Sequence, residues 1–145
     1  MSLSFSQLRQ AISTKIETIS GMRESKFPSQ YFEKSQDSII HKSFSVGIET
    51  VSDIGGRQGR GRQILVSSNV IVIFAYRLRP KDVYPTDYDN SLNLEKQIIE
   101  TILGSYGTIQ NEISIKFDSS NRNINDNLEY QITTLFFTAQ HNIGV

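Results

Sequence analysis

The sequence contains no cysteine and only two histidines, His41 and His141. Without cysteine there can be no disulfide framework and no metal site with thiolate ligands, and the composition suits a chain that folds in a reducing compartment. A zinc centre or a catalytic triad needs several placed groups, and neither histidine has partners at ligand spacing. We therefore predict that both histidines are surface or sheet-edge residues, and we expect no metal, no cofactor and no enzymatic activity.

Long apolar runs and an excess of one charge are also missing. The longest apolar run, Val70–Tyr76, is far shorter than the ~20 residues that a membrane helix needs. The N-terminal stretch MSLSFSQLRQ lacks the basic and apolar regions of a signal peptide. Fifteen Lys and Arg balance fifteen Asp and Glu, so no global attraction to nucleic acid or membrane is expected. The sequence predicts a soluble protein with one domain over residues 1–145.

Two segments show the apolar spacing of a helix. In the first, apolar residues recur every three or four positions, at Leu8, Ile12, Ile16 and Ile19. This spacing predicts a helix over about residues 5–20, with Ser4 and Gln7 as a capping box and Gly21 as the stop. The second segment, TDYDNSLNLEKQIIETILG, ends at Gly104. Asp87, Asp89 or Asn90 could cap this second helix, and acids in a first turn also stabilise the helix dipole.

Three segments alternate between apolar and polar residues as strands do, 41–51, 112–117 and 128–138, and a further strand is predicted over 63–79. Residues 22–37 show no sustained period and are predicted to be a connector, as is the polar stretch 118–127. Pro80 and Pro85 are expected to close the second strand. The resulting order is α-β-β-α-β-β, which predicts an α+β domain with an antiparallel sheet of about four main strands and two packing helices.

The second predicted strand is apolar on both sides between Val70 and Tyr76. A strand of this kind is covered on both faces, so we expect a helix on one face and a second layer or a neighbouring chain on the other. Because the first two strands are adjacent in sequence, they predict an antiparallel hairpin with a mobile basic loop, residues 52–62, at its tip.

That loop contains GGRQGRGR, residues 55–62, with four glycines and three arginines. It does not match a phosphate-binding loop, because the pattern requires Lys followed by Ser or Thr and here Arg62 precedes Gln63. A dinucleotide fold is also disfavoured, since the glycine spacing is wrong and no helix follows. Residues 118–129 resemble a calcium loop only superficially, because Arg122 brings positive charge to a ligand position.

Charge is segregated along the neutral chain. Between Asp53 and Asp82 there is no acid, while the basic residues are Arg57, Arg60, Arg62, Arg77, Arg79 and Lys81. The next stretch is mainly acidic, with Asp82, Asp87, Asp89, Glu95 and Glu100. Such a pattern suits contact with phosphates, or assembly in which a basic surface meets an acidic one, or a solvated hairpin tip without a partner. The candidate interface residues are Arg57, Arg60 and Arg62 in the loop, and then Arg77, Arg79, Asp87 and Asp89.

The sequence as a whole resembles the tail terminator proteins of long-tailed bacteriophages, also called tail completion or head-to-tail joining proteins. The likeness lies in the order of an N-terminal amphipathic helix, the strand HKSFSVGIE, an arginine-containing loop, the strand VIVIFAYRLRP, a helix opening in TDYDNSLNLE and the closing strand YQITTLFFTAQH. It implies a subunit that forms a ring with copies of itself, commonly a hexamer, which caps the tail tube and meets the neck of the head.

The resemblance also implies partners and a place. The partners would be the tail tube protein and a head-neck connector protein, with DNA passing through the lumen without sequence-specific binding, and no membrane. The protein would be assembled in the host cytoplasm and would reside in the virion, with the 52–62 loop projecting from the ring. Two alternatives remain: another neck or minor tail protein, or a small nucleic-acid-binding module that uses the Arg/Gly loop.

Overall fold

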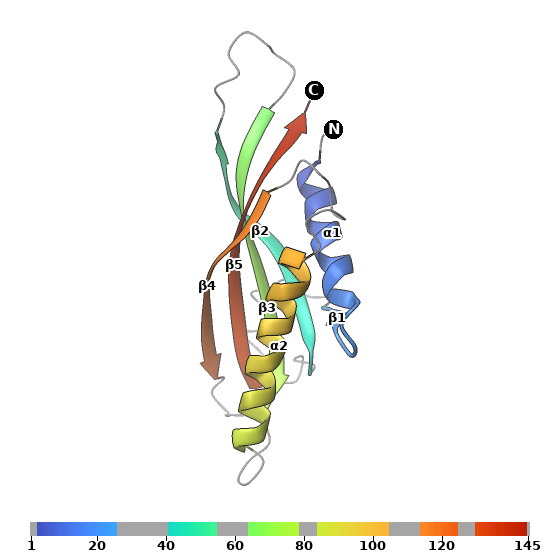
Figure 1. The fold of residues 1–145 in the computed structure, drawn as a ribbon, viewed down its shortest axis with the longest axis vertical. Helices are drawn as coiled ribbons and strands as arrows, with labels where there is room; N and C mark the ends of the chain where they lie inside the picture. The colour runs from blue at the N-terminus through green and yellow to red at the C-terminus, as the bar shows by residue number, and fades with distance from the viewer. Residues whose placement is uncertain are drawn as a thin grey trace.

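The computed structural model describes residues 3–25, 41–54, 64–78, 84–104, 114–124 and 130–144. The fold is mixed α+β: two helices and one five-stranded, mostly antiparallel sheet with the strand order β1-β2-β3-β5-β4. Both helices lie on the same face of the sheet (Figure 1). The elements are α1 (Phe5–Glu17), β1 (Arg23–Glu24), β2 (Ser43–Asp53), β3 (Ile64–Arg77), α2 (Tyr84–Gly104), β4 (Ser114–Ile124) and β5 (Tyr130–Gly144).

Helix α1 begins where its capping box predicts. The Ser4 hydroxyl accepts from the Gln7 backbone N–H, and the Gln7 side chain accepts from the Ser4 backbone N–H. The helix ends at Glu17, a few residues earlier than expected, and Gly21 follows in a left-handed turn with φ of 84°. Lys42, the residue before β2, closes this turn, because its ammonium donates to the Ser20 carbonyl at 2.9 Å.

The predicted hairpin is confirmed, since β2 and β3 pair in antiparallel fashion. On its other side β3 pairs along its whole length with β5, so β3 is the central strand of the sheet. Of the 52–62 loop, the structure describes only residues 52–54, and the glycine-arginine stretch lies outside the described residues.

Three local expectations were wrong. The segment predicted as a connector contains β1, which pairs in parallel with the start of β2. The segment 118–124 is not a loop but the second half of β4, paired with β5 beyond a bulge at Asp118. Pro85 does not close β3; it lies in the first turn of α2, where a proline needs no backbone N–H partner.

The core lies between the two helices and the inner face of the sheet. From α1 and α2 it receives Leu8, Ile12, Ile16, Leu94, Ile98 and Ile102, and from the sheet Phe44, Val46, Val70, Val72, Phe74, Leu135, Phe137 and Ala139. On the strands these residues are spaced by two, as expected for one face of a sheet. The helix-covered face is therefore a complete hydrophobic core within the subunit.

Candidate functional site

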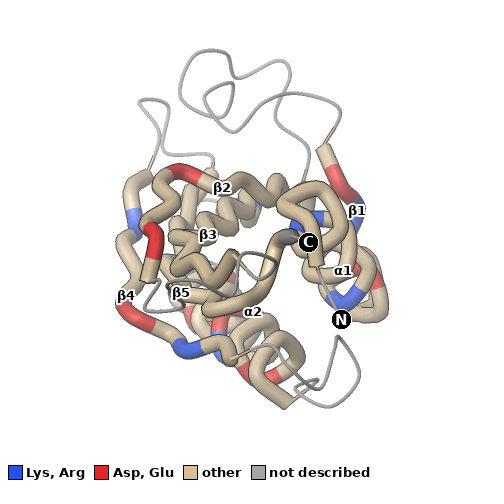
Figure 2. The backbone as a smooth tube through the Cα atoms, turned by 90° about the horizontal axis from the view of Figure 1, so that it is seen from above, with Lys and Arg blue, Asp and Glu red and all other residues tan. Residues whose placement is uncertain are grey.

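The opposite face of the sheet, which we call the open face, has no described helix or strand against it. Figure 2 shows both helices on the other side of the sheet. The centre of the open face is apolar. It consists of the half-buried Ile71 and Ile73 of β3 and Phe136 of β5, together with the buried Ala75 and Ile132. Ile71 lies directly opposite Phe136, and Ala75 lies opposite Ile132.

Charge is almost absent from the two strands at the centre of this face. Along their full lengths β3 and β5 contain one charged residue, Arg77, at the end of β3. Beyond the apolar centre the open face continues in uncharged polar side chains, with Asn69 opposite Thr138 and Ser67 opposite Gln140. A surface with an aliphatic and aromatic centre that carries little charge is typical of a protein contact surface.

A second group of exposed apolar side chains lies at the loop end of the β2–β3 hairpin. Val51, Ile54 and Ile64 are 41%, 44% and 49% exposed, although each is a large aliphatic residue. The Ile54 N–H donates to the Leu65 carbonyl at 3.1 Å, which extends the hairpin past the end of β2. In the sequence these three residues flank the basic stretch 55–62.

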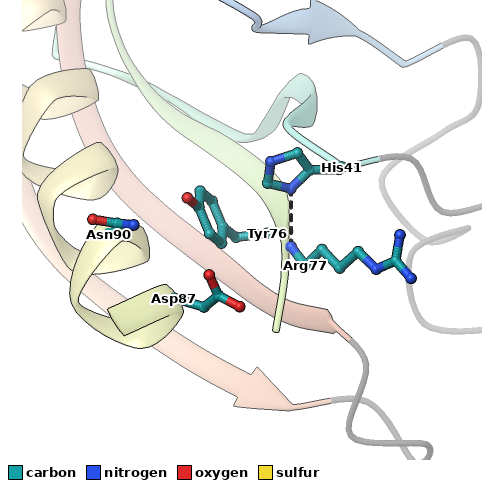
Figure 3. A pocket seen from close by; sticks show the side chains of 5 residues that line it. All are labelled: His41, Tyr76, Arg77, Asp87 and Asn90. Carbon is teal, nitrogen blue, oxygen red and sulfur yellow. Dashed lines mark hydrogen bonds between the residues drawn. The ribbon is translucent and has the colours of Figure 1, made fainter. Parts of the chain in front are cut away.

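A polar hollow of about 300 Å³ lies between the end of β3 and the start of α2 (Figure 3). It is lined by His41, Tyr76, Arg77, Asp87 and Asn90. The Arg77 backbone N–H donates to Nδ1 of His41 at 3.0 Å, and the His41 and Tyr76 rings meet edge to face at 4.6 Å. Asp87 and Asn90 project from α2 toward Tyr76, whereas the Arg77 side chain extends away from α2.

The structure brings together two of the predicted interface residues in this hollow. Arg77 is exposed at the end of β3, whereas Asp87 is only 3% exposed and belongs to the interior of the α2–sheet contact. Asp89 is exposed on α2 and does not line the hollow. The other four predicted residues, Arg57, Arg60, Arg62 and Arg79, lie outside the described residues.

Sequence reasoning missed a buried polar stripe on α2. Asp87, Ser91 and Glu95 are spaced by four, so they share one helix face, and all three are buried against the sheet. Ser91 accepts from the Gln131 amide at 2.8 Å, and one carboxylate oxygen of Glu95 accepts from Ser120 at 3.1 Å and from the Arg122 guanidinium at 2.5 Å. The spacing of four was the signal, but it is visible only once the buried face of the helix is known.

The prediction for the second histidine was wrong. His141 is 3% exposed and is held between β3 and the N-terminal segment. Its Nδ1 lies 2.8 Å from the Leu3 carbonyl, which can only accept, so Nδ1 donates and Nε2 accepts from the Ser68 hydroxyl at 2.8 Å. Phe5 packs its ring edge to face on the imidazole. The residue is a neutral structural clamp, whereas His41 is exposed as expected.

Burial gives His141 a measurable pH dependence. Desolvation lowers the pKa of His141 below its ordinary value of 6.5, with the hydrogen bond to Leu3 acting in the opposite direction. The unfolded chain therefore takes up the proton first as pH falls, so this part of the stability is complete above about pH 6.5 and declines below it toward the lowered pKa.

We expect the melting temperature of the wild type to fall more steeply between pH 7 and pH 5 than that of His141→Gln, which does not titrate. The variant will be less stable at pH 7, because glutamine cannot reproduce both hydrogen bonds. Thermal unfolding by circular dichroism at several pH values measures both effects. Parallel pH profiles for the two proteins would contradict the assignment.

Within the described residues no group of three or more histidine, aspartate or glutamate side chains is placed to hold a metal ion. In the same part of the chain, neither helix is both long enough and apolar enough to cross a membrane. No protein-family model matches the sequence, and no curated protein matches it.

Proposed function

We propose that this chain is a non-enzymatic structural subunit of a bacteriophage virion, which assembles into a ring that ends the tail tube and joins it to the neck of the head. The observation that carries the proposal is the open face. A sheet whose centre carries Ile71, Ile73 and Phe136 without a second layer in the described chain is a surface that a partner protein stabilises by covering it.

Two further features support an assembly role over a catalytic one. The largest polar features of the described chain, the α2 stripe and the His141 clamp, hold elements of the subunit together and face the interior. The exposed features are aliphatic side chains on a hairpin and the two central strands of the open face, which carry a single charged residue. Stoichiometric binding requires such surfaces, and a ring follows when each subunit makes the same head-to-tail contact with its neighbour.

The direct test is to observe the purified protein by mass photometry and negative-stain microscopy, alone and with isolated phage tails. The proposal predicts closed rings, or density that caps one end of the tail. Some rings close only on a template, so the experiment with isolated tails determines whether the proposal holds. A protein that ignores tails and instead shifts DNA at low salt would overturn the proposal in favour of phosphate binding.

The loop arginines have their own expected result. Changing Arg57, Arg60 and Arg62 together to alanine should weaken tail attachment while leaving the melting temperature of the subunit unchanged, because the sequence predicts a polar loop there and the described hydrophobic core is built from other residues. Attachment of the wild type should weaken as salt rises, and this dependence should be smaller in the triple variant.

The exposed Arg9–Glu24 ion pair provides a matched control. Its 2.8 Å contact lies on the helix side, so Arg9→Ala changes surface charge without touching the loop. Tail attachment equal to the wild type in the triple variant would show that the loop arginines do not take part.

A further inference from the structure

Among the described strands, most of β2 and all of β4 have a neighbour on one side only. At one side β1 pairs with the first residues of β2, and the Ser25 N–H donates to the Phe44 carbonyl at 2.6 Å. Beyond that point no described strand lies along β2. Because peptide groups alternate in direction along a strand, those of Val46 and Ile48 point to this free edge, as the Phe44 carbonyl does. At the other side β4 pairs with β5 alone among the described strands.

The two edges run in opposite directions. Each neighbouring pair among β2, β3, β5 and β4 is antiparallel, so β2 and β4 are themselves antiparallel to one another. Copies related by rotation about an axis along the strands keep their strand directions. The β4 edge of one copy then meets the β2 edge of the next in the antiparallel sense, and the sheet pattern continues unbroken.

The two edge strands also match in length, in having a bulge and in the face of the sheet to which their paired side chains point. Both strands are eleven residues long and both contain a bulge, between Ile48 and Thr50 in β2 and between Phe117 and Ser119 in β4. If Val46 lies opposite Arg122 of the next copy, then Val51 lies opposite Phe117. All four side chains belong to the helix-covered side, because Arg122 bonds to Glu95, Phe117 and Val46 border the core, and Val51 pairs with the inward-facing Ser68.

This register covers a side chain that is exposed in the single subunit. Val51, which is 41% exposed, would be covered by Phe117 of the next copy. In the same register no two like charges fall directly opposite one another between residues 46–52 and 116–122, an arrangement that would destabilise the pairing.

We infer that the subunits of the ring join by β-sheet extension, in which residues 116–122 of β4 pair in antiparallel fashion with residues 46–52 of β2 in a second copy of this chain. This inference rests on the proposed function, since it specifies the contact that closes the ring. All helices then lie on one side of a continuous sheet. All open faces lie on the other side, where they form one surface for a coaxial partner.

The natural absence of cysteine makes cross-linking a clean test. Gly47 and Asn121 are directly opposite in the proposed register and lie on the open face. A side chain added at Gly47 would meet no atom within 4 Å, and Asn121 is exposed. Since the Gly47 peptide groups turn toward β3, its Cα would lie about 4.5 Å from that of Asn121 across the new contact, which is within the range of a disulfide.

The double variant G47C/N121C is first assembled into rings, on isolated tails if rings close only in their presence. After mild oxidation it should give a ladder of covalent multimers on a non-reducing gel. G47C alone and N121C alone should remain monomeric, as should G47C combined with K96C, whose site is exposed on α2. A second double variant, S52C/K116C, tests the same register if the first does not fold.

The outcomes separate the contact from the function. Rings that form while both double variants stay monomeric on the gel would overturn the sheet-extension contact and leave the proposed function intact. Dimers from G47C alone would mean a symmetric β2–β2 contact, which also overturns it. If no ring forms with or without tails, the proposed function fails, and the contact that depends on it fails as well.

Discussion

Replacing Phe137 with alanine should lower the free energy of unfolding by about 3–5 kcal/mol, whereas the same change at its neighbour Phe136 should cost less than about 1 kcal/mol. The two rings point to opposite sides of β5. Phe137 is 1% exposed and packs edge to face on Phe117 at 5.5 Å, inside the core that the helices cover. Phe136 is half-buried on the open face, so its removal leaves no sealed cavity.

For attachment to tails, the larger direct effect is expected at Phe136. If the open face receives the tail tube or the neck, Phe136→Ala keeps the fold and the ring and loses most of its affinity for tails, because a central aromatic is the typical anchor of an interface. Chemical denaturation measures the first effect, and sedimentation of the variant with isolated tails measures the second. Full attachment by Phe136→Ala would remove the open face from the proposed contact.

The second large effect is expected at the ion pair between α2 and β4. Removing the guanidinium by Arg122→Ala leaves the Glu95 carboxylate in the interior without its cation. Glu95 has a side chain only 9% exposed, and its other carboxylate oxygen is buried without a hydrogen-bond partner among the described residues. Breaking a buried pair on one side typically costs about 3–5 kcal/mol. The Arg122 side chain is 35% exposed, so solvent screens part of its interaction with Glu95. We therefore expect Arg122→Ala to lower the free energy of unfolding by about 2–3 kcal/mol.

Two controls make this result interpretable. Lys96→Ala breaks the exposed pair with Glu100 on the same helix, at 3.6 Å and with both side chains mostly in solvent, and should cost less than about 0.5 kcal/mol. Adding Glu95→Gln to Arg122→Ala should recover much of the loss, because it removes the uncompensated charge. Unfolding in urea gives all these values. A double variant no more stable than Arg122→Ala would show that the arginine acts by packing alone.

Sequence-based prediction was most accurate where the spacing of apolar residues marks the side chains that are buried. The apolar spacing of α1 and its capping box predict a helix that begins at about Phe5, and the continuous apolar run Val70–Tyr76 predicts a strand, which in the structure is β3, the central strand of the sheet. It failed for the second half of β4, DSSNRNI, because that edge half is mostly exposed and therefore shows no apolar alternation. The two-residue β1 depends on a parallel pairing that no local pattern encodes.

The candidate site was harder to predict than the fold. His141 was predicted to be a surface or sheet-edge residue because it has no partner at ligand spacing in the sequence; in the structure β5 continues to Gly144 and turns this side chain inward. Asp87 and Asp89 looked equivalent as helix-start acids, yet one is buried in the α2–sheet contact and the other is exposed. Tertiary packing, which the sequence does not display, separates the two.

The contact between Leu3 and His141 has a consequence for the order in which the protein acquires its structure. These residues are 138 positions apart, and Leu3 also donates to the Asn142 carbonyl at 2.6 Å. On the ribosome the β2–β3 hairpin and the locally capped α1 can therefore form early, whereas the contacts of Leu3 with His141 and Asn142 must wait for almost the whole of β5 to be synthesised. Long-range strand pairing of this kind slows folding, so newly made subunits should mature after release, with the core exposed to chaperones in the interval.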